Sequence, residues 1–368
     1  MEGRYYYWLH NVPGIGRVTF RKILEHMSPK ELYECDMEKT KFFLTEKQRE
    51  KIKESKRHWD VSKEWELLKN RGIHMYSLGE KSYPEKLSHI SDPPPVLYYK
   101  GKKDIYNKPS VAVIGARACS NYGYLAAKEL GKELAAAGVV IVSGMARGID
   151  SICQKAGVEC GGESIGVLVS GVEICYPPEN KELFRQLQSQ GSLISENPPF
   201  TKPSAGLFPL RNRIISGLAD VVVVVESREK SGTQITVDMA LEQGKEVYAM
   251  PGRITDPVSR GCNKLIKQGA GVVLSPKEFV EDIAPLLKIK YPDRNLPFNN
   301  VLNPEEQMVT DILEVSLKTI EEIYREARNR FPEITLNKIM EIVLDLQMKN
   351  LVKEEGGYYG LKQLIFAT

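Results

Sequence analysis

The stretch Val-Ala-Val-Ile-Gly-Ala-Arg at residues 111–117 is a short apolar run, rich in β-branched residues, that ends in a glycine and a cation. A similar arrangement recurs in five later runs, at residues 139–142, 165–169, 192–195, 221–225 and 247–250. Each run lacks the apolar–polar alternation of a strand with one solvent-exposed face, and a segment with helical spacing follows it. Alternation of such runs with helices predicts an α/β fold, with a Rossmann-like, doubly wound and mainly parallel sheet.

The segments that follow these runs carry the residues of a candidate anion site. In a parallel sheet, ligands bind beyond the carboxyl ends of the strands, where backbone amides, helix N-termini and cations can meet a phosphate. The candidate residues at this edge are Gly115, Arg117, Ser143, Gly144, Arg147, Lys181, Arg211, Asn212, Arg213, Ser231, Gly232 and Thr233. For any single loop, ordinary turn and capping chemistry is an equally good explanation, but their accumulation at one edge favours phosphate binding.

The segment Arg211-Asn212-Arg213 gives the strongest signal among these candidates. We expect it at the start of a helix, where two guanidinium groups can bind adjacent phosphate oxygens and the helix dipole adds attraction. Ser231-Gly232-Thr233 is expected to open another helix in the same way. Tyr122 and Phe208, which lies three residues before Arg211, are candidate platforms for a stacked base, although core packing is the favoured interpretation of Phe208.

The motifs of nucleotide-dependent enzymes are missing from the sequence. There is neither a G-x-G-x-x-G fingerprint nor a G-x-x-x-x-G-K-[ST] loop, and all five histidines precede the predicted sheet. The carboxylates Asp150, Glu196, Glu226 and Asp238 are scattered, and Asp150 is interpreted as a helix cap. We therefore expect no catalytic site, no cofactor and, without a C-x-x-C pair, no metal site.

Composition is that of an ordinary globular protein of 368 residues, 42% hydrophobic and 27% charged, with room for two or three domains. No apolar run approaches the roughly 20 residues of a membrane span, and the six cysteines suggest reduced thiols, so we expect a soluble cytoplasmic protein. The net charge of +3 is unevenly distributed: residues 1–108 carry 22 Lys+Arg and 16 Asp+Glu, whereas residues 300–368 carry 8 and 12. We therefore expect a nucleic-acid surface in residues 1–108 or at the cation-bearing edge of the predicted sheet, and not in the acidic residues 300–368.

Two smaller domains are expected on either side of the sheet. Residues 1–80 read as a helical domain, in which two helices flank the turn Pro13-Gly14-Ile15-Gly16. That turn is either a helix-hairpin-helix contact to a DNA phosphate, assisted by Arg17, Arg21 and Lys22, or a packing turn of a bundle. The sheet domain spans 81–290. Residues 300–368 have the order of a winged-helix-like domain, whose excess of acids favours a protein contact or a regulatory role.

Several motifs of the chain resemble those of the DNA-processing protein A family (DprA, also called Smf). They are Tyr-Pro-Glu-Lys-Leu from residue 83, Pro-Pro-Pro-Val-Leu-Tyr-Tyr-Lys-Gly from 93, Gly-Ala-Arg from 115, Ser-Gly-Met-Ala-Arg-Gly-Ile-Asp from 143, Tyr-Pro-Pro-Glu-Asn from 176, Phe-Pro-Leu-Arg-Asn-Arg-Ile-Ile-Ser-Gly from 208, Ser-Gly-Thr-Gln-Ile-Thr from 231, Ala-Met-Pro-Gly from 249 and Gly-Cys-Asn-Lys-Leu-Ile from 261. The resemblance extends over roughly residues 83–275 in the correct order.

This resemblance implies a single-stranded DNA-binding protein of bacterial transformation and recombination, rather than an enzyme. Members coat incoming DNA, load the RecA recombinase onto it, and help it past single-strand-binding protein. The resemblance also implies an extended Rossmann domain that forms a homodimer through one edge of the sheet. By position, it assigns the DNA pocket to Gly115, Arg117, Ser143, Gly144, Lys181, Arg211, Arg213 and the 231–233 segment.

One departure from the family pattern is Cys153-Gln154, where members usually have Ala-His after the Gly-Ile-Asp motif. A glutamine cannot titrate, so any role of that histidine as a cation is lost, although an amide still donates hydrogen bonds. A second hypothesis also stays open at this point: a hydrolase that binds a nucleotide phosphate at the same edge and uses a carboxylate such as Glu226 to activate water.

Overall fold

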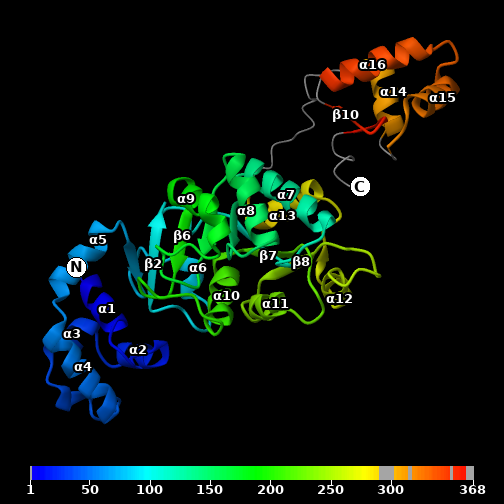
Figure 1. Ribbon diagram of the computed structural model, residues 1–368. Helices are drawn as coiled ribbons and strands as arrows, with labels where there is room; N and C mark the ends of the chain where they lie inside the picture. Colours follow the sequence, from blue (N-terminus) through cyan, green and yellow to red (C-terminus); the bar gives the residue numbers. More distant parts are fainter. Residues whose placement is uncertain (1, 290–301, 314–316, 349–350, 362–368) are drawn as a thin grey trace. The chain divides into compact units, whose positions relative to one another are not determined.

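A nine-stranded sheet lies at the centre of residues 1–291 in the computed structural model, which describes residues 2–289, 302–313, 317–348 and 351–361 (Figure 1). Its order is β1-β2-β6-β5-β4-β3-β7-β8-β9. The strands are β1 (His74–Ser77), β2 (Val96–Gly101), β3 (Ser110–Ile114), β4 (Val140–Ser143), β5 (Ser164–Val167), β6 (Ser192–Ser195), β7 (Val221–Val224), β8 (Glu246–Ala249) and β9 (Gly271–Val272). The six predicted runs are therefore confirmed as strands, and β3 to β9 pair in parallel.

The edge strand β1 and its neighbour β2 were not predicted. They pair antiparallel with each other, and β2 pairs antiparallel with β6. β1 comes from the predicted helical domain, residues 1–80, and so joins that segment to the sheet. The structure places both segments in one compact unit, residues 1–291, while residues 292–368 form a second unit.

Helices cover both faces of this sheet (Figure 1). The helices from residue 85 to 287 are α6 (Glu85–Ser88), α7 (Asn121–Ala136), α8 (Ile149–Glu159), α9 (Lys181–Gln190), α10 (Leu207–Leu218), α11 (Gly232–Glu242), α12 (Arg260–Lys267) and α13 (Pro276–Leu287). Residues of α7, α8 and α13 pack on one face, and residues of α6, α10, α11 and α12 pack on the other. This is the doubly wound arrangement that the sequence predicts.

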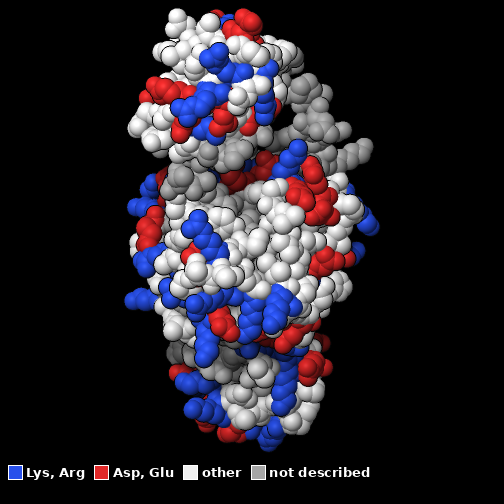
Figure 2. Space-filling model, turned by 90° about the vertical axis from the view of Figure 1, so that its right-hand side faces the viewer, with Lys and Arg blue, Asp and Glu red and all other residues white. Residues whose placement is uncertain are grey.

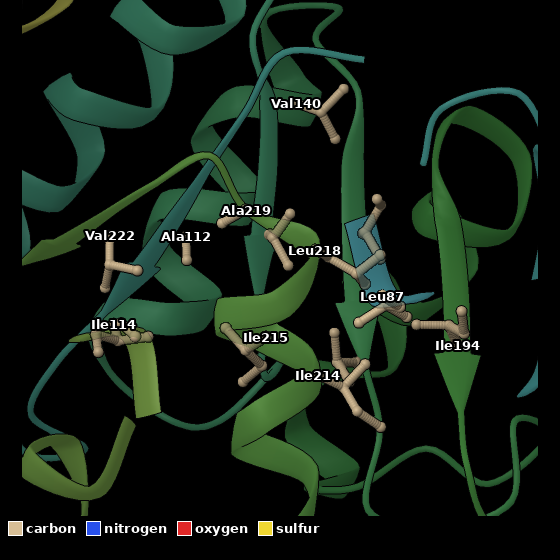
Figure 3. Packing of buried hydrophobic residues seen from close by; sticks show 14 of the residues in the cluster. Leu87, Ala112, Ile114, Val140, Ile194, Ile214, Ile215, Leu218, Ala219 and Val222 are labelled. Carbon is tan, nitrogen blue, oxygen red and sulfur yellow. The ribbon is translucent and has the colours of Figure 1, made fainter. Parts of the chain in front are cut away.

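The central strand β3 shows why the predicted runs are apolar on both sides. Val111 and Val113 belong to the cluster that contains α7 and α13, whereas Ala112 and Ile114 face the cluster of α10 and α11. Figure 3 shows Ala112 and Ile114 near Ile215 of α10. Full burial of a side chain of this size contributes roughly 1.5–3 kcal/mol to folding. The sheet is thereby a rigid base for the loops at its carboxyl edge.

The N-terminal helices form their own aromatic cluster against the edge of the sheet. They are α1 (Gly3–His10), α2 (Arg17–Leu24), α3 (Pro29–Glu34), α4 (Glu46–His58) and α5 (Val61–Asn70), with a short 3-10 turn at Met37–Thr40. The cluster includes Trp8, Phe20 and Tyr98 of β2. The two helices predicted to flank the turn at residues 13–16 are confirmed as α1 and α2, and Gly14 in the turn takes a left-handed φ of 83° that favours glycine.

The second unit has the predicted winged-helix order. Its elements are α14 (Pro304–Leu313), α15 (Ile320–Arg330), α16 (Leu336–Met348), β10 (Val352–Glu355) and β11 (Tyr358–Leu361). The sequence predicts a hairpin over residues 351–361 that turns at Gly356 and Gly357, and both glycines have positive φ. It also predicts helices over residues 305–314 and 335–350, whose last residues, Glu314 and Asn350, lie outside the described residues.

Candidate functional site

A small hollow lies at the carboxyl edge of the sheet, over strands β3, β4 and β5. It receives residues from the loops after these strands and from the first half of α10. Its lining residues are Arg117, Gly144, Ala146, Arg147, Val169, Tyr176, Pro177, Phe208 and Arg211. The hollow thus combines three guanidinium groups with two aromatic rings, next to the point where the chain reverses its winding direction between β3 and β7.

Arg211 is the buried cation of this hollow. Its Nη1 donates hydrogen bonds to the carbonyl oxygens of Gly144, at 2.8 Å, and of Val167, at 2.6 Å. Burial lowers the pKa of Arg211 to about 10, opposed by the negative charge of Asp150 and assisted by the positive charge of Arg117. Arg211 therefore stays charged at neutral pH and adds a fixed positive charge to the floor of the hollow.

Arg117 and Arg147 are the exposed cations of the hollow. The Arg117 guanidinium lies 4.9 Å from the centre of the Phe208 ring, a cation–π distance. Arg147 forms an ion pair with Glu179 on the surface. Because exposed ion pairs contribute little, a phosphate can compete with Glu179 for this guanidinium.

Of the two aromatic side chains of the hollow, Phe208 was considered as a platform for a base and Tyr176 was not predicted. Phe208, interpreted above as a core residue, is only half-buried and lies 6.1 Å, ring centre to ring centre, from Tyr176, which is 41% exposed. Tyr122, the candidate platform, is not among the lining residues; its hydroxyl donates to the carbonyl of Pro251. A sequence alone gives no signal for such a pair, because the two rings are 32 residues apart.

Asp150 has a different role from the helix cap that we predicted. The residue at the cap position of α8 is Gly148, and Asp150 is buried in the first turn, where it accepts a hydrogen bond from the amide of Gly144. Burial raises the pKa of Asp150, opposed by the charge of Arg211. The carboxyl group thereby fixes the loop after β4 through the amide of Gly144.

Other predicted site residues have structural contacts or lie beside the hollow. The buried Ser143 hydroxyl donates to the carbonyl of Val113, and a Cβ on Gly115 would lie 2.6 Å from the Ile149 side chain. Asn212 accepts a hydrogen bond from Arg211, and Lys181 is exposed at the start of α9.

The segment 231–233 opens α11, as predicted, but does not line the hollow. The Ser231 hydroxyl is hydrogen-bonded to that of Ser227 at 2.9 Å. Gly232 is exposed, and this loop follows β7, the neighbour of β3, so the segment lies at the same edge of the sheet as the hollow.

Comparison with known proteins decides the family. The model of the DNA recombination-mediator protein A family matches residues 74–284 of the chain. The chain belongs to this family. DNA processing protein DprA of Bacillus subtilis (strain 168) is 41% identical over 231 residues, which cover 62% of this chain and 75% of the relative. Protein Smf of Synechocystis sp. is 31% identical over 388 residues, covering 95% and 97%.

Two solved structures of the family are similar to this one. DNA processing protein A from Streptococcus pneumoniae has a TM-score of 0.67 and 33% identity, and the match covers 76% of this chain and 97% of that one. The Helicobacter pylori protein, whose structure is described in terms of its single-stranded DNA binding mode, has a TM-score of 0.53 and 28% identity, covering 58% and 96%.

In this family member, Arg213 lies away from the hollow, contrary to its predicted partnership with Arg211. α10 begins at Leu207, so the two arginines lie within the helix rather than at its start, and side chains two positions apart point in different directions. Arg213 is buried and bonded to Glu196, at 2.6 Å, and to Asp92, at 3.2 Å. The charge of Arg213 is therefore neutralised by carboxylates of the protein and does not face the hollow.

The same carboxylate, Asp92, also binds the arginines of the N-terminal turn. Arg17 and Arg21 each lie 2.6 Å from one of its oxygens. Although partial burial opposes ionisation, the charges of Arg213, Arg17 and Arg21 lower the pKa of Asp92 below its usual value. We call the five residues Arg17, Arg21, Asp92, Glu196 and Arg213 the arginine–carboxylate network. The network links α2 to α10. It also engages Arg17 and Arg21, two of the three cations that we expected to assist a DNA contact.

Glu226, the carboxylate of the hydrolase hypothesis, is part of a helix-capping arrangement. It is buried, and its oxygens accept hydrogen bonds from the amide and the hydroxyl of Ser120 at 2.9 and 2.5 Å. A carboxylate that is bound on both oxygens is poorly placed to take a proton from water.

The described part of the chain offers no candidate metal site and no candidate membrane span. It contains no group of three or more His, Cys, Asp or Glu that could hold a metal ion. None of the helices that the structure describes combines the length and the apolar character that a bilayer crossing requires.

Proposed function

We propose that this family member binds single-stranded DNA with the hollow at the carboxyl edge of its sheet. The observation that carries the proposal is the meeting of Arg117, Arg147 and Arg211 with the rings of Tyr176 and Phe208. Single-strand binding grooves combine cations that follow the backbone with aromatic rings on which bases stack. Family membership, and the description of the H. pylori relative in terms of single-stranded DNA, support it independently.

The proposed contacts imply weak sequence preference. Guanidinium groups bind phosphate oxygens, which every nucleotide has, and an aromatic ring stacks on any base. Binding should therefore depend strongly on salt, with log affinity falling by roughly 0.7 per phosphate engaged for each unit of log salt. Gly115, Ser143, Gly144 and Asn212 would shape the site, and Lys181 and the segment 231–233 would extend it along the strand.

Fluorescence anisotropy with a labelled oligothymidine, measured over a series of salt concentrations, tests this proposal. Arg117→Ala should weaken binding and reduce the salt slope by roughly 0.7, the value for one phosphate. Lys132→Ala, on the exposed side of α7 where its lysine pairs with Glu129, is the matched loss of one charge and should change neither. Equal titrations for the wild type and Arg117→Ala would overturn the assignment of the hollow.

We also propose that the chain forms a homodimer through the sheet edge at β9. Val272 of that edge strand is 37% exposed, the adjacent Leu274 is 71% exposed, and Leu241 of α11 is 58% exposed. A free edge strand with apolar neighbours is a surface that proteins usually cover. Light scattering of the wild type and of Leu274→Glu compares the masses: a dimer for the wild type and a monomer for the variant are expected, and a monomeric wild type would contradict the proposal.

The remaining partners and the site of action follow from family membership. We propose that the chain loads the RecA recombinase onto the bound strand in natural transformation or recombination, and that single-strand-binding protein is a second partner. The six cysteines are all unpaired, which agrees with a cytoplasmic location. We propose a binding function without catalysis, since the contacts of Glu226 give the hydrolase hypothesis no support.

A further inference from the structure

Met145, in the loop between β4 and α8, has a backbone conformation that side-chain-bearing residues rarely adopt. Its φ is 52°, in the left-handed region, and its side chain is completely buried. The residue before it, Gly144, and the two after it, Ala146 and Arg147, all line the hollow. A non-glycine residue keeps this conformation only where its surroundings impose it, so the contacts of Met145 must hold its backbone in place.

Two side-chain amides hold the two peptide groups of Met145. The Oε1 atom of Gln154, one helix turn into α8, accepts a hydrogen bond from the Met145 amide at 3.2 Å. The Nδ2 atom of Asn180, in the 3-10 turn before α9, donates to the Met145 carbonyl at 2.8 Å. The loop is thus held through its N–H from one side and through its C=O from the other.

Gln154 is itself fixed by β5. Its Nε2 atom donates to the Ser164 hydroxyl at 2.9 Å and to the Ile165 carbonyl at 3.1 Å. The side chain is fully buried. Its amide oxygen accepts from Met145, and both hydrogens of its amide nitrogen have an acceptor. The amide therefore cannot turn over without losing its bond to Met145.

We propose that Gln154 and Asn180 are positioning residues, which keep Met145 left-handed and thereby present Gly144, Ala146 and Arg147 to the hollow. We call these two residues and Met145 the Met145 clamp. This inference rests on the proposed function for its DNA readout, but neither Gln154 nor Asn180 is among the residues that line the hollow. The clamp contributes geometry rather than charge, so its loss should weaken binding without changing the salt dependence.

The chemistry of the clamp makes it independent of pH, since neither amide titrates. The charged groups around the loop are Asp150 of α8, Arg211 of α10, and Glu179 and Arg147, which pair with each other at the surface. A histidine at 154 would behave differently. Neutral imidazole can accept from Met145 through one nitrogen and donate to Ile165 through the other, whereas imidazolium has no acceptor.

The test uses the full chain with Asn180→Ala, Gln154→Met and Gln154→His, each checked for folding by its circular dichroism melt. With labelled oligothymidine at about pH 8, Asn180→Ala and Gln154→Met should bind roughly fivefold to tenfold more weakly, at the wild-type salt slope. Gln154→His should match the wild type there and bind more weakly than it at about pH 5.5, by up to about tenfold, because only the neutral imidazole can accept from Met145. Comparison with the wild type at each pH cancels any titration of Asp150.

Limited trypsin digestion at about pH 8 gives a second readout that needs no DNA. Arg147 lies in the clamped loop, and a loop that opens more often is cleaved faster. Cleavage after Arg147 should accelerate at least threefold in Asn180→Ala and stay slow in Arg185→Ala, a surface control on α9. If the wild type binds no oligothymidine but the cleavage rates behave as expected, the proposed function fails and the clamp stands. Wild-type cleavage rates in Asn180→Ala and Gln154→Met would overturn the clamp.

Discussion

The guanidinium group of Arg211 occupies the space in which a side chain at Gly144 would lie. A Cβ atom added to Gly144 would be 2.2 Å from the Arg211 Nη1 atom, which also donates to the Gly144 carbonyl. The glycine is therefore required by the approach of a buried cation, rather than by its own backbone angle. The motif glycine and the motif arginine, 67 residues apart, act as one unit at the floor of the hollow.

Gly144→Ala should displace Arg211 and deform the hollow. We expect a loss of stability of about 1–3 kcal/mol, as for other overpacked interiors, together with oligothymidine binding at least tenfold weaker. Chemical denaturation and anisotropy measure the two effects. Gly138→Ala, at a helix end with open space around it, is the control for adding a methyl group, although its positive φ of 69° adds strain of its own. If Gly144→Ala kept the wild-type stability and oligothymidine affinity, Arg211 could move aside without loss, and the account of this contact would be wrong.

Arg213→Ala should destabilise the protein far more than it affects binding. It leaves Glu196, whose side chain is 13% exposed, without its charged partner, so we expect a loss toward the lower end of the about 3–5 kcal/mol that is typical of a fully buried pair. Urea unfolding should show this loss, and the salt slope of oligothymidine binding should keep its wild-type value. Arg185→Ala removes an exposed arginine that pairs with Glu182 across one helix turn, so the stability of this variant should stay within about 0.5 kcal/mol of the wild type. A reduced salt slope of oligothymidine binding in Arg213→Ala would show that Arg213 contacts a DNA phosphate after all.

Asp92 of the arginine–carboxylate network should make stability fall in acid. The folded-state pKa of Asp92 lies below its unfolded value of about 3.9, so its contribution is fully present above that pH and is lost as the pH falls through the folded pKa. The difference in unfolding free energy between the wild type and Asp92→Asn should thus be constant above about pH 5 and shrink below about pH 4. A difference that grew on acidification would contradict the sign of the shift.

Much of the fold could be predicted because it depends on local patterns. A central parallel strand is buried on both faces, as Val111 to Ile114 show, so its run is continuously apolar and easily found. The strand Val96–Gly101 was missed because it follows a proline run and belongs to no repeat of strand and helix. β9 has only two residues, which is too short for any periodicity.

The site was less accessible from the sequence than the fold. The edge that gathers Arg117, Gly144 and Arg147 follows from the topology of a parallel sheet. Arg213 was misplaced because its direction depends on where α10 begins, and boundaries are the least certain part of such a prediction. The contacts of Arg211, Gln154 and Asn180 join segments far apart in the chain, and only the folded structure reveals them.

Glu226→Gln separates a capping role from a catalytic one. The carboxylate accepts from both donors of Ser120, so the amide should lose one of these bonds and about 0.5–2 kcal/mol of stability. Oligothymidine affinity should stay unchanged, as measured by anisotropy. Release of phosphate from a nucleotide panel by the wild type, abolished in Glu226→Gln, would instead support the hydrolase hypothesis.

A structure of the full chain with bound oligothymidine tests the central claim most directly. We predict phosphate oxygens within hydrogen-bonding distance of the Arg117 and Arg147 guanidinium groups, with Glu179 released from Arg147 and a base against Tyr176 or Phe208. Oligothymidine bound elsewhere on the protein, with the hollow between Arg117 and Arg211 empty, would contradict it.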